Sequence, residues 1–557
     1  MTWMFGLLFV TFYTSGLCER SEKNKGFPVL SPKWIVMQNH ILKLVVFTSG
    51  MSVMAVEMSG LRLLAPYYGT SLIVTTVLIG SLMGFLSLGY WLGGRWGDKH
   101  PNLKALSKVT MVASGFIVLI PFISQPILRT TSSTMRMFLS GDGNLESSVA
   151  LFSIGGGIVA TLGLMAIPIT LMGAVSPWAV RLAVDSVNDS GKAAGRLYAL
   201  STFGSILGSF LPALVLIPLL GVQRTYLAIG VVFLAVSCLG LFTGLMRAVP
   251  PAVLLLGFFL PPAQIRPVDV EGGELVWEEE SIYHFIQVVR QPLKSGCKDA
   301  YVLYLNEGIA SHSIKCLEEG RATKGIWAYM AATPLWMDDP KALSDVLLVG
   351  LAGGTVAKQL LQSFPDAKVD GVEIDGAVVE VGKEFFDNSH PNINPIVMDG
   401  RMFLSNTDSS YDLVLMDAYR QPYIPFHLVT QEFFQQVHDH LNEDGVLAVN
   451  VASVRGVSKD LAAMIYRTMK DVFPTVTLVR ASRSNDVIIA TKKQKDPFIG
   501  ADHMEKYGLE IGLRAIKKKF RKKITPEVDG WKTARLLTDD QAPVEMAWDL
   551  MAFKYAK

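Results

Sequence analysis

Hydrophobic residues follow different patterns in the two halves of the chain. Residues 41–262 contain long apolar stretches, whereas residues 267–557 alternate short β-branched runs with polar, helix-like segments. Because about 20 apolar residues are needed to cross the ~30 Å hydrocarbon core of a bilayer, the first half predicts membrane spans. We expect six of them, at residues 44–61, 71–94, 109–128, 149–178, 197–220 and 225–246.

Two further apolar segments border these spans. Residues 1–18 lack the basic start of a secretory signal, and no A-x-A cleavage site follows, so an additional span is favoured there. The segment from Pro250 to Pro262 is short and bracketed by proline. Its length does not decide whether it crosses the membrane, lies in the interface or forms a re-entrant turn.

Polar and small residues within the spans indicate two further features. Glu57 is costly in lipid unless it is paired or reached by water. It is therefore either a site candidate or a residue near a span end that meets Arg62 or headgroup water. Glycines spaced four residues apart predict close helix packing, at Gly80 and Gly84 and at Gly204 and Gly208.

The basic residues between the spans predict an orientation. They gather in residues 20–43 and after the even-numbered spans, whereas the alternate loops hold fewer. The positive-inside rule places the richer loops in the cytoplasm. If residues 250–262 do not cross, the C-terminal half is cytoplasmic too. We therefore expect a multi-pass protein of the inner (plasma) membrane with a cytoplasmic catalytic domain. The richer loops contain Arg95, Lys99, Lys104, Lys108, Arg181, Lys192, Arg196 and Arg247, and the alternate loops Arg62, Arg129, Arg136 and Arg224.

Composition supports lipid contact and narrows the chemistry. Half of the residues are hydrophobic, 18% are charged and the mean hydropathy is +0.34. A net charge of +2 gives no overall field that would attract nucleic acid. The basic run from Ile516 to Lys523 is expected to rest on anionic lipid. We expect no metal site and no disulfide scaffold, since the four cysteines are widely spaced, at Cys18, Cys238, Cys297 and Cys316.

From residue 345 onward the pattern predicts a doubly wound α/β sheet. Continuous apolar runs such as DVLLVG, AKVDGVEID and YDLVLMDAY alternate with helical segments. In such sheets ligands bind outside the carboxyl ends of the strands. The first strand leads into a glycine-rich turn at Gly350, Gly353 and Gly354, directly before a helix.

Acidic residues follow the next three strands of this predicted sheet. Glu373 ends the second strand at the place where an acid accepts hydrogen bonds from ribose hydroxyls. Asp399 and Gly400 follow the third strand, and Asp417 follows the fourth. The pattern indicates a nucleoside site, but the spacing suits NAD as well as an S-adenosyl compound.

These motifs together resemble a known enzyme family. VLLVGLAGGTVAKQL, VDGVEIDGAVVEVGKEFF, VMDGRMFL and LNEDGVLAVN resemble the spermidine synthase (polyamine aminopropyltransferase) group of the S-adenosylmethionine-dependent methyltransferase fold. ESIYHFIQVV resembles the small N-terminal β-domain of that group, and LLTDDQAPVE resembles the closing motif of bacterial proteins that fuse such a domain to a transporter-like membrane domain.

The resemblance implies a fold in several parts. We expect an α-helical membrane domain and a small β-domain, followed by a doubly wound, Rossmann-like methyltransferase domain. The expected boundaries are 1–40 for an N-terminal apolar segment and basic linker, 41–262 for the membrane domain, 267–335 for the β-domain with a connecting helix, and 336–557 for the nucleoside-binding domain.

The resemblance also implies roles for single residues. Gly350, Gly353 and Gly354 would shape the loop around the methionine side of the nucleoside, and Glu373 would hold the ribose. Asp399, with Gly400, would face the adenine amino group. Asp417 would accept a proton from the attacking amine, a role that a carboxylate at a strand end can perform.

The chain departs from the family pattern on the amine side. Gly353 stands where the family has an acid, and Asp417-Ala418-Tyr419-Arg420-Gln421-Pro422 replaces D-S/T-x-D-P, so two acids that would bind a diamine are missing. Arg420 would favour a carboxylate. His284 and His312 are candidates to bind the nucleoside or are ordinary structural residues. Tyr283 and Tyr419 could contact a sulfonium or belong to the core.

Three functions follow as hypotheses. The first is a membrane-bound enzyme that transfers an aminopropyl or alkyl group from decarboxylated S-adenosylmethionine or S-adenosylmethionine to an amine. The second is methyl transfer or lyase cleavage of S-adenosylmethionine without a polyamine. The third is a small-solute transporter with a nucleoside-sensing domain. The expected partners are a nucleoside, an amine and membrane lipid, without nucleic acid, and the resemblance also implies a homodimer.

Overall fold

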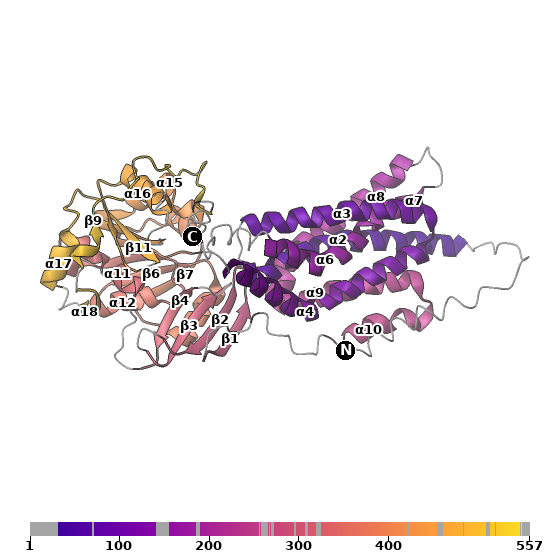
Figure 1. The fold of residues 1–557 in the computed structure, drawn as a ribbon, viewed down its shortest axis with the longest axis horizontal. Coiled ribbons are helices and arrows are strands. Elements are labelled where there is room, and N and C mark those ends of the chain that lie inside the picture. Colours follow the sequence, from indigo (N-terminus) through magenta and orange to yellow (C-terminus); the bar gives the residue numbers. More distant parts are fainter. Residues whose placement is uncertain are drawn as a thin grey trace, which may run out of the picture.

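The protein consists of a helical bundle followed by a mixed α/β region, as seen in a computed structural model (Figure 1). The structure describes residues 32–547 except 69–71, 141–154, 185–189, 256, 258–265, 267, 269–271, 294–296, 307–309, 319–324, 420–422, 454–459, 483, 508–512, 518–519 and 546. The predicted N-terminal span at 1–18 and the candidate Arg420 therefore lie outside the described residues.

Long apolar helices form the N-terminal bundle. Among the described residues, five helical segments are long and apolar enough to cross a membrane, at Met37–Tyr68, Val74–Lys99, Leu103–Thr131, Gly157–Ala183 and Ser190–Leu241. The last segment contains a break at Gly221, which has a φ of 76°. The helices are α2 (Pro32–Tyr68), α3 (Leu72–Lys99), α4 (Leu103–Ser140), α6 (Gly157–Gly173), α7 (Val175–Ala183), α8 (Ser190–Leu211), η4 (Pro212–Leu216), α9 (Ile217–Leu241) and α10 (Val249–Leu255).

Small residues bring some of these helices into backbone contact, but not all of the predicted ones do so. A Cβ added at Gly204 or Gly208 would lie 2.1 Å from a carbonyl oxygen of α2, so both glycines are needed where α8 packs on α2. A Cβ added at Gly80 or Gly84 would have no neighbouring atom within 4 Å. The prediction of close packing is wrong for this pair, because α3 turns that face away from the helices described around it.

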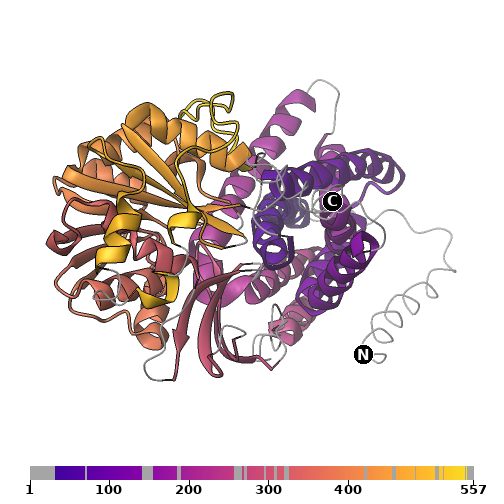
Figure 2. The ribbon, with the colours of Figure 1, turned by 60° about the vertical axis from the view of Figure 1, so that its left-hand side comes forward.

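A four-stranded antiparallel sheet, hereafter the β-domain, follows the bundle (Figure 2). Its strands lie in the order β1 (Glu274–Glu280), β2 (Phe285–Gln291), β3 (Ala300–Leu305) and β4 (Ser311–Cys316). Cys297, just before β3, forms a disulfide with Cys316 at the end of β4, with their Cα atoms 6.0 Å apart. The sequence did not predict this disulfide, since pairing across a sheet cannot be read from two widely spaced cysteines.

The C-terminal half contains the predicted doubly wound sheet. Its strand order is β12-β10-β11-β9-β8-β5-β6-β7. The strands from β9 to β7 pair in parallel. The pairs β12–β10, β10–β11 and β11–β9 are antiparallel. The strands are β5 (Asp345–Val349), β6 (Lys368–Glu373), β7 (Ile393–Val397), β8 (Tyr411–Met416), β9 (Leu441–Ala452), β10 (Thr475–Val479), β11 (Asn485–Thr491) and β12 (Ile524–Thr525).

Helices cover both faces of this sheet. Alternate residues of β5 enter different cores, Val346 and Leu348 on one face and Leu347 and Val349 on the other, which explains why the strand reads as an unbroken apolar run. The helices are α11 (Ile326–Met330), α12 (Thr355–Ser363), α13 (Gly376–Phe386), α14 (Gly400–Asn406), α15 (Gln431–Asp439), α16 (Asp460–Val472), α17 (Ile499–Tyr507) and α18 (Arg514–Lys517).

The basic run at the end of this domain does not lie beside the bundle. Figure 1 shows α18 at the end of the α/β domain that is remote from the helical bundle. Ile516 and Phe520 are buried in the core, and the Phe520 ring stacks on Tyr329. This position does not support the predicted contact with lipid headgroups, because the apolar members of the run anchor it to the α/β core.

The disulfide gives a prediction for stability. Cys297 and Cys316 are 19 residues apart, and closing a loop of that length stabilises a fold by about 3 kcal/mol. We expect dithiothreitol to lower the urea midpoint of the wild-type chain. A variant with both Cys297→Ser and Cys316→Ser should already have the lower midpoint and should not respond to reductant. Equal midpoints for all samples would contradict the disulfide.

Candidate active site

The carboxyl ends of four adjacent parallel strands place the predicted acids along one edge of the sheet. Glu373 is the last residue of β6, Asp399 follows β7, and Asp417 follows β8. Backbone hydrogen bonds hold these strand ends level, since Asp417 N–H donates to Val349 O (2.9 Å) and Met398 N–H donates to Glu373 O (3.0 Å). The structure therefore brings the three acids to one side of the domain.

The glycine-rich turn lies between these acids. Gly350 has a φ of 94°, and a Cβ at this position would lie 2.6 Å from Ala418 N, so glycine is required where the turn passes the segment after β8. Gly354 has a φ of 82° and immediately precedes α12. The turn thus presents backbone at the N-terminus of a helix next to Asp417, as expected of a nucleoside loop.

Gly353 of the turn also contacts the β-domain. Its N–H donates to Ser313 Oγ of the β-domain at 2.8 Å. A Cβ at Gly353 would lie 2.8 Å from Ser313 Cβ and 2.9 Å from the Phe386 ring. Glycine at this position therefore allows the β-domain to pack on the loop, and its predicted contact with a nucleoside stays a prediction.

Glu373 is held by backbone donors. Its Oε2 accepts a hydrogen bond from Ala352 N–H (2.9 Å) and its Oε1 accepts one from Asp375 N–H (3.2 Å). Burial raises the pKa of this carboxyl, while the charge of His284 and the two backbone donors oppose the shift. Each oxygen keeps capacity for a further hydrogen bond, which is what two ribose hydroxyls would need.

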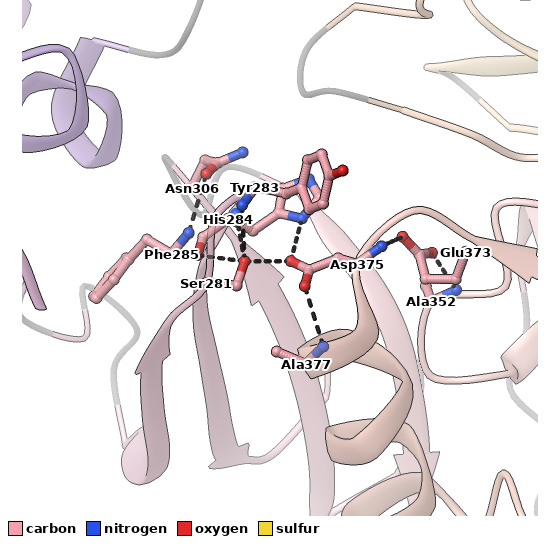
Figure 3. A network of polar contacts seen from close by, with 9 residues as sticks. All are labelled: Ser281, Tyr283, His284, Phe285, Asn306, Ala352, Glu373, Asp375 and Ala377. Atoms are coloured by element: carbon pink, nitrogen blue, oxygen red, sulfur yellow. Dashed lines mark hydrogen bonds and ion pairs between the residues drawn. The ribbon is translucent and has the colours of Figure 1, made fainter. Parts of the chain in front are cut away.

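Asp375 joins the β-domain to the end of β6 (Figure 3). Its Oδ2 accepts hydrogen bonds from Ser281 Oγ (2.5 Å) and lies 2.9 Å from His284 Nδ1, while its Oδ1 accepts one from Ala377 N–H at the start of α13. His284 is 6% exposed. The network supports the structural alternative for His284, because its Nδ1 is used to connect the two domains.

Asp399 begins α14 and has a histidine partner. Its Oδ1 caps the helix by accepting hydrogen bonds from the N–H groups of Arg401 and Met402. Its Oδ2 lies 2.9 Å from His427 Nε2. The hydrogen bond from His427 lowers the pKa of Asp399, so the carboxyl is an anionic acceptor at neutral pH. Gly400 is the first residue of α14, and a Cβ there would lie 2.4 Å from Val349 Cγ1.

Asp417 is a half-buried carboxyl with neutral partners. Asn450 Nδ2–H donates to its Oδ1 at 2.7 Å, and Asn485 Nδ2–H donates in turn to Asn450 Oδ1 at 3.0 Å. Burial raises the pKa of Asp417 to about 6, while hydrogen bonds from Asn450 and the Trp327 side chain lower it. A carboxyl with this pKa is suited to accept a proton near neutral pH.

The remaining predicted substrate residues are placed less directly. The Tyr419 hydroxyl donates to Asn450 O and accepts from Ala452 N–H, which fixes its ring against β9. Tyr283 is 39% exposed beside His284, and His312 lies on β4. Their contacts with a substrate stay predictions.

Sequence reasoning did not identify several residues of this edge. Asp375 lies two residues after Glu373, and an acid at a strand-to-helix turn is a recognisable helix cap. Asn450 and His427 come from β9 and η9 (Phe426–Leu428), far along the chain. Only the fold brings these two side chains to Asp417 and Asp399, so no local signal could have identified them.

Comparison with known proteins identifies part of the chain. Residues 329–499 match the family model of the spermine/spermidine synthase domain. A probable polyamine aminopropyl transferase of Bifidobacterium longum is 29% identical over 294 residues, which cover 49% of this chain and 62% of the relative. A polyamine aminopropyltransferase of Vibrio vulnificus is 26% identical over 315 residues, which cover 54% of this chain and 99% of the relative.

The chain also has some similarity to a solved structure. The crystal structure of a probable spermidine synthase from Corynebacterium glutamicum aligns with a TM-score of 0.36 and 18% identity, and the alignment covers 47% of this chain and 98% of that one.

Burial of Asp417 gives a prediction that needs no substrate. An aspartate whose pKa rises from 3.8 to about 6 on folding stabilises the native state below about pH 4, and this contribution is lost as the pH rises through 6. The loss amounts to about 3 kcal/mol, since one pKa unit corresponds to ~1.4 kcal/mol. We expect Asp417→Asn to raise the urea midpoint relative to wild type at pH 8 but not at pH 4. The same gain with the exposed Asp408→Asn, or no gain with Asp417→Asn, would contradict this.

The strand-end acids, the glycine turn and the matched residues agree on one assignment. The C-terminal half of the chain contains a spermine/spermidine synthase domain, matched over residues 329–499.

Proposed function

We propose that this chain is a membrane-embedded transferase that moves an aminopropyl or related alkyl group from an S-adenosyl sulfonium nucleoside to an amine. The position and raised pKa of half-buried Asp417 carry the proposal. It lies beside the glycine turn, on the same sheet edge as Glu373 and Asp399, with a pKa of about 6. This combination provides a base next to acceptors for a nucleoside, and the similarity to polyamine aminopropyltransferases supports the reaction class.

The carboxylates match the polar groups of such a nucleoside. Glu373 can accept hydrogen bonds from ribose hydroxyls on the lone pairs that Ala352 and Asp375 leave unused. Asp399 is anionic and partly exposed, with 23% of its side chain accessible, so it can accept from the adenine amino group. Decarboxylated S-adenosylmethionine and S-adenosylmethionine share both groups, and this part of the site suits either compound.

Asp417 would act at the reacting amine. The amine nitrogen attacks the carbon bonded to the sulfonium, an N–C bond forms as the C–S bond breaks, and the thioether nucleoside leaves. The proton lost by the nitrogen passes to an oxygen of Asp417. Because the sulfonium is already a good leaving group, the domain contributes mainly by holding amine, carbon and sulfur in line. Asn450 fixes the orientation of the Asp417 carboxyl for this step.

The surroundings of Asp417 set a limit on the acceptor. Asn450, Asn485 and Trp327, the partners described for the Asp417 side chain and its chain of hydrogen bonds, are all neutral. A dicationic acceptor needs a second acidic group, so these partners favour an acceptor with one ammonium group. The same observation supports the second candidate function, in which S-adenosylmethionine reacts by methyl transfer or lyase cleavage without a polyamine.

Membrane embedding is supported by the outer surface of the bundle. Large apolar side chains are exposed on α3, α8, η4 and α9, including Met83 (64%), Phe203 (64%), Leu214 (66%) and Leu219 (76%). Exposed apolar surface of this extent is unfavourable in water and is normal for helices that face lipid. Five helices of membrane-crossing length carry it.

The products distinguish these functions. The purified full-length chain is incubated with S-adenosylmethionine or its decarboxylated form, each with and without putrescine or a monoamine. We expect 5′-methylthioadenosine together with an aminopropylated amine. S-adenosylhomocysteine would indicate methyl transfer, and 5′-methylthioadenosine formed without any amine would indicate a lyase. Asp417→Asn should lower kcat by about 10²–10⁴-fold, the usual contribution of a general base, whereas the exposed Asp408→Asn should not change it.

The pH dependence gives a further prediction. A base must be deprotonated, so kcat/KM should rise with pH through about 6, the pKa of Asp417. Asn450→Leu removes a hydrogen bond that lowers this pKa, and its profile should therefore move to higher pH. A profile for Asn450→Leu with the wild-type midpoint would show that another group acts as the base.

A further inference from the structure

The two ends of the helical bundle differ in charge. At one end, Arg181 forms an ion pair with Asp98 (3.2 Å) and Trp178 Nε1–H donates to His100 O, which brings the α3–α4 turn to the end of α7. We call this the basic end, because most basic residues near the helix ends of the bundle lie there. They are Arg95, Lys99, Lys104, Lys108, Arg181, Lys192, Arg196 and Arg247, whereas the helix segments toward the opposite end contain Arg62, Arg129, Arg136 and Arg224.

The β-domain docks on the opposite end. Glu280, the last residue of β1, accepts a hydrogen bond from Val222 N–H (2.7 Å) directly after the break in α9 at Gly221. From there α9 runs to the basic end, where a Cβ added at Gly240 would touch Ser107 near the start of α4. At 1.5 Å per residue this length of helix spans about 30 Å, the thickness of a bilayer core. Figure 1 shows the α/β half and the start of α2 at opposite ends of the bundle.

The chain returns from the basic end to the β-domain. After α9, Arg247 Nε–H donates to Phe242 O, and α10 then packs along α9. Gly257 lies beside Leu227, close to the Gly221 end of α9. A Cβ added at Gly257 would lie 3.9 Å from Leu227 Cδ1. Arg266 is already within the β-domain, where it donates to Asn306 O and Gln287 Oε1. The described part of the proline-bracketed segment, residues 250–255 and 257, thus runs from the basic end toward the β-domain.

The disulfide lies on the same side as this docking contact. Cys297 and Cys316 are paired in the β-domain. Protein disulfides persist in oxidising compartments and are rare in the cytoplasm, where thiols are kept reduced. This observation is independent of the charge of the bundle, yet it concerns the same question of which side the domain faces.

We infer that the basic end of the bundle faces the cytoplasm, and that the β-domain and the spermidine synthase domain lie on the non-cytoplasmic side of the membrane. The inference rests on the membrane embedding proposed above. It replaces the sequence-based expectation of a cytoplasmic catalytic domain, which assumed that residues 250–262 do not cross. The domain would then take its nucleoside and its acceptor from the outer compartment.

Accessibility of single cysteines tests the orientation in the full-length chain. Ser409→Cys lies in an exposed loop of the α/β domain and Asn102→Cys in the exposed α3–α4 turn at the basic end. Both are made with Cys18→Ser and Cys238→Ser, while the disulfide pair is retained. Intact cells or spheroplasts are treated with a membrane-impermeant maleimide, and a permeant maleimide serves as the matched control.

We expect Ser409→Cys to react fully before lysis and Asn102→Cys only after permeabilisation. The reverse pattern would overturn the inference. In a second measurement, Cys297 and Cys316 of the chain taken from cells under alkylating conditions should react only after reduction, and free thiols at these positions would contradict an oxidising compartment. Release of the chain from membranes by alkaline carbonate would overturn the embedding itself. None of these results depends on catalysis, so they separate this inference from the proposed reaction.

Discussion

The candidate site depends on one constraint, the parallel pairing of β8, β5, β6 and β7 in a register that makes them end together. Val349 of β5 pairs with Val372 of β6 and Met416 of β8, and Glu373 pairs with Val397 of β7. All four strands therefore end together, and the residues that follow them share one edge. Because side chains alternate between the faces of a strand, a slip of one residue would turn Glu373 toward the other face and take it away from Ala352. The buried residues of both cores thus fix the geometry of the polar edge.

Asp417, at this edge of the sheet, lowers the stability of the fold when its carboxyl is ionised. A largely desolvated carboxyl whose described partners are neutral is destabilising when it is ionised, and its raised pKa reflects that destabilisation. The neutral hydrogen bond from Asn450 compensates only in part. A lysine or arginine in the place of Asn450 would stabilise the ionised form more strongly, but it would also lower the pKa and weaken the base. The asparagine is consistent with a site that gives up stability for a base that works near neutral pH.

The sequence predicted the parts of the structure that depend on local pattern. The doubly wound sheet, the apolar helices and the placement of Glu373, Asp399 and Asp417 at strand ends all follow from apolar runs and the residues directly after them. Contacts between distant segments could not be predicted. The disulfide of the β-domain and the bond from His284 to Asp375 depend on how two domains or two strands meet. The packing of Ser313 on Gly353, from 40 residues upstream, could not be predicted for the same reason.

The contact at Gly221 has a consequence for how separable the two halves are. Gly221 has a backbone conformation that other residues rarely adopt, and this interrupts α9 and leaves Val222 N–H as the first donor of the following helix. The cap for that donor is Glu280, which belongs to the β-domain. The cap at this helix start in the bundle is therefore provided by β1, which follows the bundle in the sequence. A fusion of this bundle to an unrelated C-terminal domain would lose the Glu280 cap. The two halves of the chain therefore depend on each other and are not interchangeable modules.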